Sequence, residues 1–100
     1  MNQPREQLIY VSKLREVRPL LNYLLSEDIS FDSTEGFTTI TFRIYDRCFR
    51  IENVEDNHYN LIITEDITDK VDTIHNIVTM DEIAEIVETH HEQIIERTYN

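Results

Sequence analysis

Four histidines, one cysteine and twenty acidic residues are the side chains of this 100-residue chain that could hold a metal ion or carry out catalysis. Glu88 and His91 have the Glu-x-x-His spacing of di-iron sites, but such sites need matching carboxylates from several long helices, and the sequence has one such motif. His58 and His75 have no further His or Cys at the spacing of a zinc site. The acidic stretch 65–72 lacks the central Gly of a calcium loop. We therefore expect no metal and no cofactor.

Catalysis by side chains alone has equally little support. Cys48 lies beside a predicted turn, and no neighbouring residue marks it as an activated nucleophile, so we interpret it as a half-buried structural thiol. No two carboxylates stand out as an acid and base pair in different environments. The chain has a single glycine, Gly36, which disfavours glycine-rich phosphate-binding loops. The sequence therefore predicts a protein that is not an enzyme.

The chemistry that the sequence favours is electrostatic. Residues 1–50 contain seven acids and seven Lys or Arg, whereas residues 51–100 contain thirteen acids against Lys70 and Arg97, which accounts for the net charge of −11. Such asymmetry indicates a partner of opposite charge. A pI near 4.6 argues against direct binding to nucleic acid or to an anionic membrane, because their phosphates would be repelled.

The densest acidic surface is expected on a C-terminal helix predicted over 80–97. At 100° per residue, one arc of this helix holds its core-facing residues, with His91 on the flank: Ile83, Ile86, Val87, His90 and Ile94. The opposite arc, called the acidic arc below, holds Asp81, Glu82, Glu85, Glu88, Glu92 and Glu96. Like charges one turn apart destabilise a helix. A helix whose charged face only contacts solvent usually includes lysines among its acids. Two interpretations of the acidic arc are possible. It is either a solvated face, or a row of carboxylates that takes the place of nucleic-acid phosphates on a basic partner.

Other residues are expected to extend this partner-binding surface. The additional acids lie before the C-terminal helix, in the predicted loop around 55–58 and in the acidic stretch 65–72: Glu55, Asp56, Glu65, Asp66, Asp69 and Asp72. The candidate apolar anchors beside them are Tyr59, Ile95, Tyr99 and Phe37. Three arginines near the middle of the chain, Arg43, Arg47 and Arg50, form a small basic spot that we expect to pair with Glu52 and other acids.

The elements that position these residues follow from local patterns. Pro4 and the apolar spacing after it predict a helix over 4–26 that is bent or broken at Pro19. Alternation then predicts strands over 29–33, 37–45, 48–54 and 59–63, with turns at 34–36 and 46–47, and a hairpin that pairs Tyr45 with Cys48.

The last third of the chain is predicted to return to helix. Apolar residues spaced by three and four predict a short helix over 66–77. Thr79 and Glu82 form a capping box, and Val78 and Ile83 are placed as a hydrophobic staple, so the final helix should begin at Met80. The predicted fold class is α+β in one domain, 1–100. An N-terminal helical segment and two C-terminal helices pack on one face of a three- to four-stranded antiparallel meander.

This order of elements in a small acidic chain is similar to that of some anti-CRISPR proteins, which are acidic phage proteins that block Cas9. The similarity covers size, acidity and element order. We expect a cytoplasmic, non-enzymatic protein that occupies a basic, nucleic-acid-binding surface of a protein partner, as a phage or mobile-element inhibitor or as an accessory subunit. The alternative is an immunity protein that neutralises a basic toxin such as a nuclease. No membrane contact is expected, and the sequence leaves monomer and homodimer open.

Overall fold

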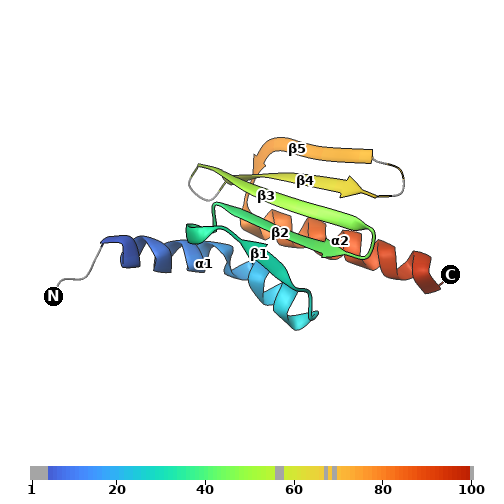
Figure 1. Ribbon diagram of the computed structural model, residues 1–100, viewed down its shortest axis with the longest axis horizontal. Helices are drawn as coiled ribbons and strands as arrows, with labels where there is room; N and C mark the ends of the chain where they lie inside the picture. Colours follow the sequence, from blue (N-terminus) through green and yellow to red (C-terminus); the bar gives the residue numbers. More distant parts are fainter. Residues whose placement is uncertain (1–4, 56–57, 67, 69, 100) are drawn as a thin grey trace.

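The computed structural model describes residues 5–55, 58–66, 68 and 70–99, with side chains for all of these except 5–11, 70, 72–77 and 98–99. Its elements are α1 (Arg5–Ser26), β1 (Phe31–Ser33), the 3-10 turn η1 (Glu35–Phe37), β2 (Thr39–Ile44), β3 (Arg47–Glu55), β4 (His58–Glu65), β5 (Lys70–Val78) and α2 (Met80–Tyr99). The strands form one antiparallel sheet in the order β1-β2-β3-β4-β5. In Figure 1 the helices lie on one side of this sheet, and the fold class α+β is confirmed.

α1 is one continuous helix that contains Pro19, so the alternative of a break is excluded, and Figure 1 shows a bend between its two halves. Its buried stripe consists of Val17, Leu20, Leu21 and Leu24. The helix ends in a Schellman motif, in which Ile29 N–H donates to the carbonyl of Leu24 at 2.8 Å and Asp28 takes a φ of 58°. Because this cap uses Ile29, the first strand begins at Phe31, two residues later than predicted.

The hairpin of β2 and β3 has a different register from the predicted one. Ile44 pairs with Arg47 and Arg43 with Cys48, so the two-residue turn is Tyr45-Asp46 and Tyr45 takes a φ of 52°. A shift by an even number of residues leaves each strand's inward side chains unchanged, and Phe49 stays in the core. It also moves Arg47 from the turn into β3.

The helix predicted over 66–77 is wrong, because β5 occupies most of that range, and α2 is the single C-terminal helix. Five of the nine residues of β5 are β-branched, which favours an extended strand. Apolar spacings of three or four over such a short segment fit either structure. Pairing with β5 also satisfies the backbone donors and acceptors along the second edge of β4. The similarity to some anti-CRISPR proteins rested in part on an element order with two C-terminal helices, and the structure does not have that order.

α2 begins at Met80 as predicted. Glu82 N–H donates to Thr79 Oγ1 at 3.4 Å, and the same hydroxyl donates to the Glu82 carboxylate at 3.1 Å. Val78 and Ile83, the two residues of the staple, are both buried. The inward face of α2 joins the stripe of α1 and the inner face of the sheet in one apolar cluster, in which the Phe42 and Phe49 rings stack at 4.9 Å.

Candidate functional site

The acidic arc lies on the solvent side of α2. All six of its carboxylates are exposed: Asp81, Glu82, Glu85, Glu88, Glu92 and Glu96. From the first to the last of these residues the helix rises about 22 Å at 1.5 Å per residue. The arc is therefore a straight row of negative charge that is long compared with the Debye length of about 8 Å at physiological salt.

The arc has no compensating cation among the described residues. Among the described residues, the lysines and arginines that form ion pairs do so with acids outside the arc. These pairs are Lys13 with Glu16, Arg43 with Asp66, Arg50 with Glu52, and Arg97 with Glu65. Arg97 is the only lysine or arginine of α2, and its Nη1 lies 3.8 Å from Oε1 of Glu65 in β4. Basic side chains thus pair with acids on α1 and on the sheet or its loops and not with the acids of the arc.

Beside the acidic arc, α1 packs against α2, and the contact between the two helices is called the seam below. The Tyr23 hydroxyl shares a hydrogen bond of 2.8 Å with Nδ1 of His91, which also lies 3.7 Å from the Glu27 carboxylate. The pKa of Tyr23 is raised from 10.0 to about 12, first by burial and then by the negative charges of Glu27, Glu88 and Glu92. Carboxylates from both helices therefore surround this seam.

His91 is consequently a buried residue, 9% exposed, and its prediction as a flank residue is wrong. The sequence pattern of α2 alone could not show this, because the neighbour that covers His91 is α1. His90 faces the sheet as predicted, with its ring edge-on to Phe49 at 5.7 Å between centroids.

Two of the predicted apolar anchors are not available to a partner. Phe37 is buried at 9% exposure, and Tyr59 is 1% exposed. The Tyr59 hydroxyl donates to the Glu16 carboxylate and accepts from Lys13 Nζ at 3.3 Å. Burial, followed by the hydrogen bond to Glu16 and the charge of that residue, raises the pKa of Tyr59 far above its usual value. The alternation of Tyr59 with Leu61 and Ile63, both core residues, was the signal for its inward direction.

The remaining predicted site residues are spread over several elements. Ile95 is half-buried beside the arc, and Glu55 is exposed at the end of β3. Asp66 is exposed and paired with Arg43, and Glu65 is half-buried and faces Arg97. Asp56 and Asp69 lie outside the described residues, as do the side chains of Asp72 in β5 and Tyr99 in α2.

A buried cation that the sequence did not predict lies under the sheet. Arg47 is 4% exposed, its Nη1 lies 2.5 Å from Nδ1 of His90, and its Nε is buried without a hydrogen-bond partner. Correct placement of the turn at Tyr45-Asp46 would have revealed its inward direction.

Metal chemistry and membrane insertion can be addressed for the described residues only. Among them, no three His, Cys, Asp or Glu side chains are grouped so that they could hold a metal ion. Neither described helix has a stretch that is both long and apolar enough to cross a membrane.

Comparison of this chain with family models, with curated proteins and with solved structures gives no match in any of the three.

Proposed function

We propose that the protein is a non-enzymatic binding protein whose acidic arc occupies a basic, nucleic-acid-binding surface of a partner protein, as an inhibitor or an accessory subunit. The observation that carries this proposal is the uncompensated charge of the arc. Six exposed carboxylates lie in a row on one helix, while the ion pairs formed by lysines and arginines among the described residues are with acids elsewhere. Like charges one turn apart destabilise a helix. A face that only contacts solvent does not require them, so their presence supports a role in binding.

Such a surface acts by steering and occlusion. A row of negative charge raises the rate of encounter with a basic groove, and it repels the nucleic acid that would otherwise enter. Ile95, half-buried at the edge of the arc, supplies apolar contact next to the charges. Such contact slows dissociation, because fully desolvated groups carry most of the energy of an interface.

The test compares two variants that change the net charge equally. Glu85→Lys with Glu92→Lys reverses two charges of the arc, and Asp32→Lys with Glu35→Lys reverses two exposed acids that are not among the expected partner-binding residues. Each purified protein is used to capture partners from a lysate at low and high salt. The wild type and the control should capture the same nucleic-acid-binding protein at low salt, duplex DNA should release it, and the arc variant should lose it.

Equal capture by the arc variant would place the interface elsewhere, and loss in the control would move it to the segment around Asp32 and Glu35. A captured toxin nuclease would identify the chain as an immunity protein. A captured protein that does not bind nucleic acid, and that DNA does not displace, would overturn the proposal.

A further inference from the structure

β1 is an edge strand of the sheet, paired on one side with β2. Next to it, Thr34 N–H donates to the carbonyl of Thr39 at 3.0 Å, in the register of the β1–β2 pairs. Because bonded and non-bonded pairs alternate along an antiparallel ladder, Asp32 is bonded to β2, and the N–H and C=O groups of Phe31 and Ser33 point away from it. Among the described residues, no other element bonds to these outward groups. We propose that this edge binds, as an added strand, an extended segment of another protein in which apolar and basic residues alternate.

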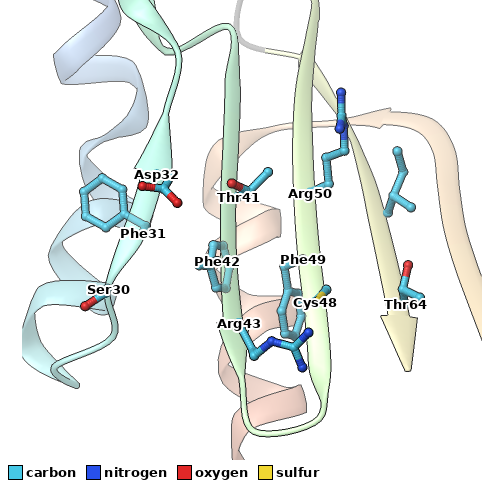
Figure 2. A pocket seen from close by; sticks show the side chains of 11 residues that line it. Ser30, Phe31, Asp32, Thr41, Phe42, Arg43, Cys48, Phe49, Arg50 and Thr64 are labelled. Carbon is cyan, nitrogen blue, oxygen red and sulfur yellow. The ribbon is translucent and has the colours of Figure 1, made fainter. Parts of the chain in front are cut away.

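The two faces of an added strand meet different surroundings. Phe31 pairs with Phe42 of the core, so its side chain lies on the face that carries the helices, and the next residue, Asp32, lies on the other, outer face. Figure 2 looks onto the outer face and shows Asp32 beside Thr41 there. Residues directly opposite one another in a sheet share a face. A residue opposite Phe31 therefore points toward α1, and a residue opposite Asp32 points onto the outer face.

On the helix side, the edge of β1 borders a hollow of about 280 Å³ at the end of α1. It is lined by Leu25, Asp28, Ile29, Ser30 and Phe31. Leu25 is 68% exposed, and beside it Ile29 and Phe31 are half-buried against the core. An apolar side chain placed in this hollow would cover Leu25 and extend the core to the added strand. The helix side of the edge therefore selects an apolar residue.

On the outer face, the edge selects a basic residue. A groove of about 530 Å³ reaches β1 on this face, and Asp32 is one of its lining residues. Asp32 is exposed and forms no ion pair among the described residues. Arg50, which lies on the far side of Thr41 from Asp32, is paired with Glu52 at 2.9 Å. A lysine or arginine directly opposite Asp32 would make the favourable cross-strand pair of opposite charges.

The charge around the edge favours a basic segment over an acidic one. No lysine or arginine occurs from residue 19 to residue 42, whereas this stretch contains four acids, all exposed: Glu27, Asp28, Asp32 and Glu35. Their potential attracts a basic segment and repels an acidic chain, including a second copy of this protein with its charge of −11. β1 is short and offers few backbone hydrogen bonds, so the apolar contact and the charges must supply the selectivity.

This site is separate from the acidic arc, since the arc lies on α2 and the site is formed by β1 and the end of α1. The inference does not rest on the proposed function. It assigns the protein a second binding surface, for an extended segment rather than for a folded basic surface.

The test follows amide hydrogen exchange by NMR, with a short synthetic peptide of alternating valine and lysine as the probe. In the free chain, the outward amides of Phe31 and Ser33 should exchange faster than the amide of Asp32, which is bonded to β2. The peptide should slow the exchange of Phe31 and Ser33 severalfold and leave that of Asp32 unchanged. A peptide of the same composition, with its valines and lysines in two blocks, is the control for charge alone.

Single substitutions test the two faces of the site separately. Asp32→Lys and Leu25→Gln should each weaken binding of the alternating peptide severalfold, with circular dichroism confirming that both variants are folded. Val54→Gln is the matched control for Leu25, since Val54 is 49% exposed on β3, and it should leave the affinity unchanged. Glu85→Lys with Glu92→Lys should also leave the peptide bound at β1, because these residues belong to the arc.

Three results would overturn the proposal. Equal protection by the block peptide would show that charge alone attracts the probe. Peptide binding that leaves the amides of Phe31 and Ser33 unprotected would place the probe elsewhere on the chain. Exchange at these amides that slows as the free chain is concentrated would show that a second copy covers the edge. Because Asp32→Lys should release the peptide and still permit capture through the arc, failure of this proposal is distinguishable from failure of the proposed function.

Discussion

Nη1 of Arg47 lies 2.5 Å from Nδ1 of His90, and this contact joins β3 to α2 beneath the sheet. A guanidinium can only donate, so Nδ1 must accept and His90 carries its proton on Nε2. Arg47 is 4% exposed, and its Nε is buried without a hydrogen-bond partner, so a charged side chain is held inside with at least one donor unsatisfied. The pair is therefore a sensitive point of the fold.

We expect the two partners of this pair to respond differently to apolar substitution. His90→Leu removes the acceptor of Nη1 and leaves a second donor of the buried guanidinium unsatisfied, which should cost about 1.5–3 kcal/mol of unfolding free energy. Arg47→Met removes the charge itself and leaves only a neutral ring nitrogen without its donor, so it should cost less than His90→Leu. Urea denaturation of both single variants and the double variant measures the coupling. A double variant no more stable than His90→Leu would show that the unpaired charge is not the cause.

The buried tyrosines predict loss of stability at alkaline pH. The pKa of Tyr23 in the folded protein is about 12 against an ordinary value of 10.0, and burial also raises that of Tyr59. A group whose pKa is higher in the folded state stabilises the fold fully below its unfolded pKa, and this contribution disappears as the pH rises through the folded value. The unfolding free energy should therefore fall between about pH 10 and 12.

Urea denaturation at a series of alkaline pH values tests this expectation. Tyr23→Phe should reduce the dependence on pH, whereas Tyr45→Phe, at a residue that is 61% exposed, should leave it unchanged. Equal pH dependence in the wild type and the Tyr23→Phe variant would contradict the stabilising effect assigned to Tyr23.

The start of α2 can be tested by removing one hydroxyl. Thr79→Ala deletes the cap that accepts from Glu82 N–H and should cost about 0.5–2 kcal/mol. Thr89→Ala is the matched control, since its hydroxyl donates to the Glu85 carbonyl within the helix and Ala is the better helix former there. Thermal denaturation of both variants should show a lower midpoint for the first alone. Equal thermal midpoints for the Thr79→Ala and Thr89→Ala variants would mean that the Thr79 cap does not stabilise α2.

Association with the proposed basic partner should depend strongly on salt. The acidic arc is exposed and uncompensated among the described residues, so its attraction for a basic surface is screened by ions. Between about 50 and 500 mM salt, the association rate measured by stopped flow should fall steeply, while the dissociation rate changes little. A flat association rate would show that contacts other than charge drive the encounter.

Several features of this protein were determined by residues close together in the sequence. The start of α2 at Met80 follows from Thr79 and Glu82, and the inward face of β2 follows from strict alternation. The exposure of the arc follows from the helical period of α2. Each of these depends on a hydrogen bond or a side-chain direction within about one turn or a few residues.

The tertiary structure decided what depends on distant neighbours. The apolar spacing of β5 fits a helix as well as a strand, and its pairing with β4 is what distinguishes the two. Arg47 is buried because the hairpin closes at Tyr45-Asp46, which the pairing along both strands selects over the predicted register. His91 and Tyr59 are buried because α1 lies against them. The pattern within one helix or strand indicates to which side of that element a side chain points. Only the packing of a second helix or strand against that side determines whether the side chain is buried.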